Sequence, residues 1–264
     1  MKHHRDLRHP LEQMQRESRH MRLGETREGA KRWYIYRRLS SDYEREFENL
    51  FFERDGIRRF VSERKNKGLP VVIGDFMSDG HALSGFLPDA GLAISLRDNT
   101  NERIRAEYVA AHISVLEGDL SHAAAWREID RWLDVQAPDS KKFDLILCCP
   151  HGPMTLFSDD PRFLFVFLQR MWRRLNPDGG MLLTQVPRSF SYLLESWERT
   201  LHIQGIDVLS DMSMLKHPRF VPKQDFFSPQ YVEISPHIRI DRKISDPERL
   251  PVWTEEELAE KQQA

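Results

Sequence analysis

The stretch Val71-Val72-Ile73-Gly74-Asp75-Phe76-Met77-Ser78-Asp79-Gly80 decides the fold of this 264-residue chain. A short apolar run at 69–73 leads into a segment with two glycines and two aspartates, and a helical pattern follows from His81 to Phe86. Continuous apolar runs of this length are typical of strands buried in a parallel sheet. The stretch therefore predicts a strand, a ligand loop at Gly74–Gly80 and a helix, the opening unit of a nucleotide-binding α/β domain.

The same alternation of apolar runs and helical patterns continues along the chain. Further strands are predicted at 92–96, 112–116, 143–149, 181–186 and 206–209. The segment 231–240 alternates apolar and polar residues and contains Pro236, which favours an antiparallel edge strand. We therefore expect an α/β fold, Rossmann-like and doubly wound, with a mostly parallel seven-stranded sheet and an antiparallel last strand.

Charge and composition divide the chain into four parts. Residues 1–40 hold eleven Lys or Arg against five Asp or Glu, a balance of +6, whereas the whole chain has a net charge of −2. The predicted parts are a basic, partly flexible arm at 1–40, a helical extension at 41–68, the Rossmann-like domain at 69–240 and a polar tail at 241–264. The arm would suit an anionic partner such as nucleic acid, although docking on the chain's own acidic body is the favoured interpretation.

The helical extension begins with a pattern that favours a helix start. Ser41 and Glu44 have the Ser-x-x-Glu spacing of a capping box. Tyr43 and Phe47 then recur at helical spacing, and we expect them to serve as core packing.

Several classes of protein are disfavoured by composition. No apolar run reaches the roughly 18 residues of a membrane span, so no membrane association is expected. The only cysteines, Cys148 and Cys149, are adjacent, which suits neither a disulfide nor a metal site. We expect a cytoplasmic protein without a bound metal.

Acidic residues stand at the predicted ends of successive strands. Ligands of an open parallel sheet bind beyond the carboxyl ends of its strands. Asp98 follows the second predicted strand and lies eighteen residues after Gly80, near the interval of roughly 20 residues typical of nucleoside-binding units. Asp119 follows the third strand, and Cys149 ends the fourth. A helix cap is the alternative role for Asp98 and for Asp119.

Residues 69–187 resemble a class I S-adenosylmethionine (SAM)-dependent methyltransferase. The resemblance rests on Val71–Leu83, on the segment 117–120 (Glu-Gly-Asp-Leu), on the strand 143–147 and on the turn 175–180 (Leu-Asn-Pro-Asp-Gly-Gly). It implies SAM as cofactor. It also implies that Asp98 binds the ribose and that Asp119 contacts the adenine.

The first motif departs from the family pattern. Anchored on Gly80, the family's Gly-x-Gly-x-Gly falls on Phe76, Ser78 and Gly80, and its preceding acid falls on Gly74. A shift of one residue would give the acid's role to Asp75. The cofactor-binding residues that the resemblance implies are Gly74, Asp75, Phe76, Ser78, Gly80, Asp98, Asp119 and Cys149.

Methyl transfer needs alignment of donor and acceptor more than a diagnostic catalytic side chain, because proximity alone contributes about 7–11 kcal/mol. His151 is the candidate general base, since its unperturbed pKa lies near 6.5; a loop histidine bonded to backbone or water is the alternative. Substrate-loop candidates are Pro150, Gly152, Tyr34, Tyr36 and Arg37.

Three other functions compete with methyl transfer. A catalytically inactive Rossmann module, which binds a nucleoside weakly or acts as an interaction protein, is favoured by Phe76 and Ser78 in the glycine loop. An NAD enzyme would suit Asp98, but the first loop lacks Gly-x-Gly-x-x-Gly. An RNA modifier would use the basic arm, but no RNA-binding module is recognisable. The sequence does not name the methyl acceptor or the oligomeric state.

Overall fold

A computed structural model describes residues 39–95, 101–120, 122–149, 161–186, 191–211 and 236–251. They form one seven-stranded sheet with the strand order β3-β2-β1-β4-β5-β7-β6. The strands are β1 (Val72–Phe76), β2 (Ala90–Ser95), β3 (Ile113–Glu117), β4 (Leu145–Cys148), β5 (Met181–Gln185), β6 (Asp207–Asp211) and β7 (His237–Asp241). Six strands run parallel and β7 runs antiparallel to both its neighbours, β5 and β6. The predicted Rossmann-like fold is confirmed.

The prediction that the last strand forms an edge is wrong. The edges of the sheet are β3 and β6, and β7 lies between β5 and β6. Pro236 precedes the strand rather than interrupting it, and its carbonyl accepts a hydrogen bond from Val186 N at 2.8 Å. Proline removes a backbone donor only at its own position, so a strand that starts one residue later can pair on both sides.

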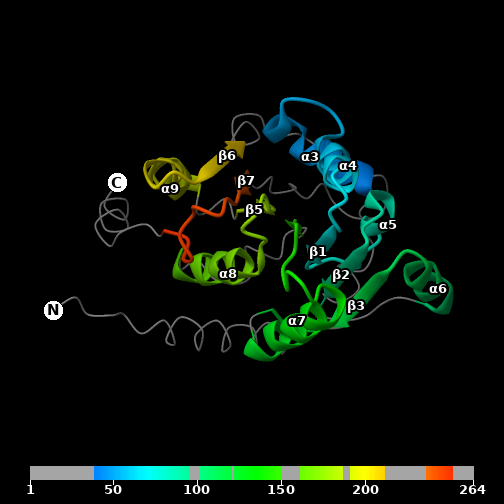
Figure 1. Ribbon diagram of the computed structural model, residues 1–264. Coiled ribbons are helices and arrows are strands. Elements are labelled where there is room, and N and C mark those ends of the chain that lie inside the picture. The colour runs from blue at the N-terminus through cyan, green and yellow to red at the C-terminus, as the bar shows by residue number, and fades with distance from the viewer. Residues whose placement is uncertain are drawn as a thin grey trace, which may run out of the picture.

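Helices cover both faces of the sheet (Figure 1). One face carries α3 (Ser40–Phe51), α4 (Gly56–Asn66), α5 (Leu83–Phe86) and α6 (Glu102–Ala110), which share one hydrophobic cluster with it. The other carries α7 (Ala123–Gln136), α8 (Pro161–Arg174) and α9 (Ser191–Ile203). Helices on both faces explain why the central strands are buried throughout.

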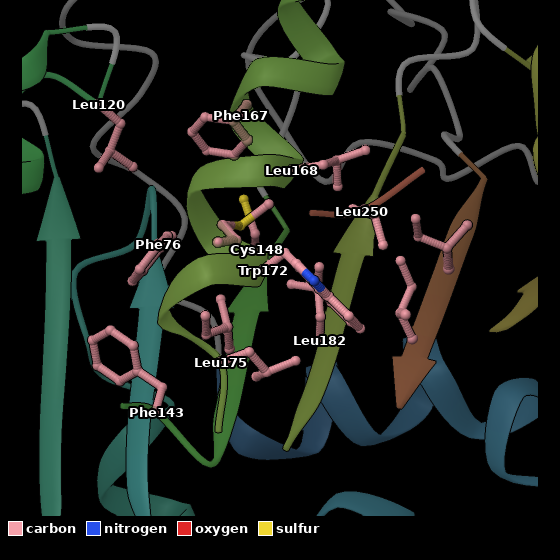
Figure 2. Close-up of a cluster of buried hydrophobic side chains, with 14 of the residues drawn as sticks. Phe76, Leu120, Phe143, Cys148, Phe167, Leu168, Trp172, Leu175, Leu182 and Leu250 are labelled. Atoms are coloured by element: carbon pink, nitrogen blue, oxygen red, sulfur yellow. The ribbon is translucent and has the colours of Figure 1, made fainter. Parts of the chain in front are cut away.

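The core under α7, α8 and α9 is rich in large side chains (Figure 2). Phe167, Leu168 and Trp172 of α8 lie over Cys148 of β4 and Leu182 of β5. Such side chains stabilise a fold by about 1.5–3 kcal/mol each when fully buried.

The predicted capping box at Ser41–Glu44 is wrong, because helix α3 begins at Ser40, two residues earlier than an N-cap at Ser41 requires. Leu39 is the N-cap, and its backbone N–H donates to Asp42 at 2.9 Å. Glu44 instead accepts from the backbone N–H groups of Ile57 and Arg58, at 3.2 and 2.8 Å. It therefore caps the start of α4, whose own N-cap residue makes no side-chain cap bond.

Helix α4 is joined to the sheet by an ion pair. Arg64 donates to Asp144 at 2.6 Å, and both side chains are largely buried. Asp144 also accepts from Val72 N at 2.9 Å and from Asn176 Nδ2 at 2.8 Å. Burial raises the pKa of the Asp144 carboxyl, and these hydrogen bonds and Arg64 oppose the rise.

Residues 242–251 pack on the helices rather than leaving the domain at once. Leu250 is buried, and its backbone N–H donates to Gln169 of α8. Trp172 and Trp197 donate their ring N–H groups to the carbonyls of Pro247 and Pro251. The described part of the predicted polar tail thus contributes to the core; the domain boundaries themselves stay predictions.

Candidate functional site

The candidate site lies at the carboxyl ends of the central strands. The strand order reverses between β1 and β4, which makes this pair the topological switch point where such sheets bind ligands. The parallel register aligns Phe76 with Ile94 of β2 and with Cys148 of β4. The segments after β1, β2 and β4 therefore begin at one level of the sheet.

Strand β1 begins and ends three residues later than the apolar run at 69–73 predicts. Gly74, Asp75 and Phe76 belong to the strand and are buried, so the loop that follows begins at Met77. The run starts poorly as a strand because Leu69 is partly exposed and Pro70 has no backbone N–H.

The Phe76 ring turns back along the strand, away from its carboxyl end. Its Cε1 would lie only 2.8 Å from a Cβ built at Gly74. The ring packs edge-on against Trp126 and Phe143, with each pair of ring centroids 5.7 Å apart. Figure 2 shows the Phe76 and Phe143 side chains of this cluster. Gly74 thus makes room for this ring, and the ring points into the core rather than beyond the strand.

Two left-handed residues shape the loop after β1. Met77 has φ 61° and Gly80 has φ 82°. A Cβ at Gly80 would also lie 2.6 Å from the Ala93 side chain. Both the positive φ and this close approach therefore require glycine at position 80. A left-handed methionine is uncommon, and such strain tends to gather at ligand sites.

The loop is held by its neighbours on β2 and α6. Ser78 N donates to Ile94 O at 3.1 Å, and the Tyr108 hydroxyl donates to Asp79 O at 3.0 Å. The backbone at these residues is therefore positioned by the strands and helices around it.

Asp75 is fully buried on the α3 side of β1. The Tyr43 hydroxyl of α3 donates to its Oδ1 at 2.6 Å. This distance is at the short end of the ordinary range for O–H···O hydrogen bonds. We predicted Tyr43 as core packing; it is that, and it also binds an acid 32 residues away, a partnership that periodicity alone does not reveal.

Asp119 follows β3 and is 9% exposed. Its Oδ2 lies 3.0 Å from Nδ1 of His122, and its carbonyl accepts from His122 N at 2.8 Å. His122, rather than Asp119, is the N-cap residue of α7. The next residue, Leu120, is buried, and its carbonyl accepts from Trp126 Nε1.

The remaining predicted site residues divide into two groups. Cys149 follows β4 and is 3% exposed, within the cluster on the α3 side. Asp98, Pro150, His151, Gly152, Tyr34, Tyr36 and Arg37 lie outside the described residues. The cap of α6 is Asn101, which accepts from Ile104 N at 2.9 Å, so that helix does not use Asp98 as its N-cap.

The one-residue shift of the first motif stays a prediction, and the backbone can be compared with it. It places the acid on Asp75 and the first glycine on Met77, and Met77 is the residue with the left-handed φ that glycine adopts most easily. Asp79 and His81 then occupy the other two glycine positions. The described strand ends thus carry a buried acid in β1, a left-handed turn directly after it, and the buried Asp119 after β3.

Two kinds of feature are absent from the described residues. Between 39 and 251, the described parts contain no group of three or more His, Cys, Asp or Glu side chains that could hold a metal ion. No helix in those same parts is both long and apolar enough to cross a membrane.

Comparisons with known proteins return solved structures only. No family model matches this chain, and no curated protein matches it. One similar structure is the MycE methyltransferase of the mycinamycin biosynthetic pathway, solved with Mg and SAH, at 16% identity and a TM-score of 0.42, over 85% of this chain and 55% of that one. Another is a SAM-dependent O-methyltransferase of Thermotoga maritima, at 12% identity and a TM-score of 0.36, over 70% and 65%.

A third is a release-factor-specific protein-(glutamine-N5) methyltransferase of Alicyclobacillus acidocaldarius, at 16% identity and a TM-score of 0.29, over 70% and 90%. The chain spans less than two thirds of the length of the first two of these proteins.

Proposed function

We propose that this protein is a SAM-dependent methyltransferase with an acceptor still to be identified. The observation that carries the proposal is the arrangement at the end of β1. A buried acid, Asp75, is followed by the left-handed Met77 at the switch point between β1 and β4. This is the order of acid and turn that the sequence resemblance implies.

The two acidic residues of the site suit the chemistry of SAM. SAM, when bound, supplies a methyl group on a cationic sulfonium, and its amino-acid part carries an ammonium. A buried carboxylate is favoured beside a positive charge, because an unpaired buried charge is costly. Asp75 would face the amino-acid part, and Asp119 would accept from the adenine.

The residues of this chain would act mainly by positioning. The hydrogen bonds from Ser78 to β2 and from Tyr108 to Asp79 O hold the turn before any ligand arrives. Preorganised groups avoid the cost of ordering on binding. His151 is proposed as the base that would take a proton from the acceptor.

Calorimetry tests the proposal with three ligands: SAM, S-adenosylhomocysteine (SAH) and NAD. We expect saturable binding of SAM and SAH and none of NAD. Asp119→Asn should weaken SAH about tenfold, because it removes a charged acceptor. The matched control is Asp130→Asn on α7, whose half-exposed carboxylate pairs with Arg174 of α8 far from the strand ends, and it should leave the affinity unchanged.

A protein that folds normally yet takes up neither sulfur ligand at millimolar concentration contradicts the proposal. That result favours the inactive Rossmann module instead.

A further inference from the structure

Tyr43 belongs to α3, a helix that precedes the Rossmann-like strands, yet it contacts the strand that carries the proposed ligand site. Its side chain is 0% exposed, as is that of Asp75. The hydroxyl-to-carboxylate distance of 2.6 Å is short for a hydrogen bond between side chains.

The Tyr43 ring has little freedom to move. It stacks on Phe47 of the same helix, with centroids 6.5 Å apart, and meets Phe86 of α5 at 6.4 Å. Helix α3 is fixed independently at its other end, where Asn49 donates to Asp211 of β6 at 2.9 Å and Leu50 O accepts from Arg239 of β7 at 3.2 Å. The hydroxyl is therefore delivered to Asp75 by a helix anchored across several strands.

Packing alone does not require a polar contact at this position. A phenylalanine at 43 and an apolar residue at 75 would fill the same space without a buried carboxylate, and buried polar pairs are often replaced by apolar residues at no loss of stability. A buried acid with a side-chain donor aimed at it is the arrangement expected of a group held in place for a site.

We propose that Tyr43 is a positioning residue for the ligand site: its hydroxyl orients the Asp75 carboxylate toward the ammonium of the bound ligand's amino-acid part. This rests on the proposed function. Helix α3 then belongs to the ligand site, and removing one oxygen atom from it would weaken recognition of one end of the ligand only.

The test uses two probes that differ in that end. SAH carries the amino-acid part, whereas 5′-methylthioadenosine has the same nucleoside and lacks the ammonium and carboxylate. Calorimetry with both probes on the full-length chain measures the wild type, Tyr43→Phe, Asp75→Asn and the double variant.

We expect Tyr43→Phe to weaken SAH about tenfold and to change the affinity for methylthioadenosine less than twofold. Asp75→Asn should weaken SAH at least as much, and the double variant should lose little more than Asp75→Asn alone, because the two residues act as a unit. An equal loss for both probes, or additive losses in the double variant, overturns the inference.

A control separates positioning from stability. Trp197→Phe removes a buried donor, the ring N–H that binds Pro251 O at 2.9 Å, on the opposite face of the sheet. It should lower the melting temperature without changing the ratio of the two affinities. If Tyr43→Phe unfolds at 25 °C, the same ratio is measured at 10 °C, and Asp75→Asn measured alone at 25 °C keeps the inference testable.

The two proposals fail in different ways. A wild type that binds neither probe contradicts the proposed methyltransferase. A wild type that binds SAH, with Tyr43→Phe binding both probes as tightly as the wild type does, contradicts only the role of Tyr43.

Discussion

Gly74 is the residue that lets Phe76 occupy a strand end without blocking it, and Gly74→Ala tests this directly. The added Cβ would lie 2.8 Å from Phe76 Cε1 and 3.2 Å from Phe143 Cε1. Carbon atoms pack at about 3.5–4.0 Å, so the Phe76 ring would have to move by roughly 0.7 Å. It is fully buried and packs edge-on against Trp126 and Phe143, so any movement disturbs these contacts.

We expect Gly74→Ala to lower the free energy of unfolding by about 1–3 kcal/mol, the usual cost of overpacking a core. The loss of glycine's flexibility in the unfolded chain offsets up to about 1 kcal/mol of this. Urea denaturation followed by tryptophan fluorescence measures the change, since Trp126 contacts the ring.

A second-site variant makes the prediction specific. Phe76→Leu alone should cost about 1–2 kcal/mol through lost packing. With the ring gone, Gly74→Ala should cost at least 0.5 kcal/mol less than it does in the wild type, a coupling that only residues in contact show. Additive losses, or a Gly74→Ala protein as stable as the wild type, would refute the reasoning. Loss of SAH binding at unchanged stability would instead mean that Gly74 lets the protein backbone approach the ligand closely.

Three further predictions concern other parts of the fold. Arg64→Met should lower the free energy of unfolding measured in urea by about 3–5 kcal/mol, because it leaves the buried Asp144 without its charged partner. Arg59→Met, on the exposed side of the same helix, should lower it by less than about 0.5 kcal/mol. Burial raises the pKa of Asp144 in the folded state, so its contribution to stability is fully present below the unfolded-state pKa and is lost as pH rises through the folded-state pKa. The stability lost in Arg64→Met should therefore shrink as the solution is acidified. A loss that does not change with pH contradicts this. Met77→Ile should be about 1–2 kcal/mol less stable than Met77→Leu, because a β-branched side chain fits poorly at a positive φ, and equal melting temperatures would exclude that strain.

The fold was largely predictable because its signals are local. Apolar runs separated by helical patterns predicted seven strands, and the described residues form seven. The position of β7 inside the sheet was not predictable, since half-covered alternation and a nearby proline are also typical of an edge. Pairing on both sides depends on which strands lie beside it, and that is set by the whole sheet.

The candidate site was predictable only in part. The order of acids after the strands placed Asp119 correctly beyond β3. The start of the loop was three residues out, because an apolar run and a strand need not share their ends. Tyr43 was recognised as buried but not as the partner of Asp75, since no sequence pattern links a helix residue to an acid 32 positions later. Contacts of this kind are decided by packing.

The first motif looks degenerate when its residues are compared one by one with the family pattern, yet two features of its geometry offset the bulk of Phe76 and the missing glycine at 77. A bulky Phe76 in the strand would crowd the ligand if its ring pointed onward, but the ring folds back over Gly74 into the core. The turn needs a left-handed residue, and Met77 supplies it at a cost of about 1–2 kcal/mol. If a glycine at 76 were essential for the backbone to approach the ligand, a second glycine at 74 that makes room for the Phe76 ring would serve no purpose. The pairing of Gly74 with Phe76 is therefore better explained by a strand end kept clear than by one that has been filled.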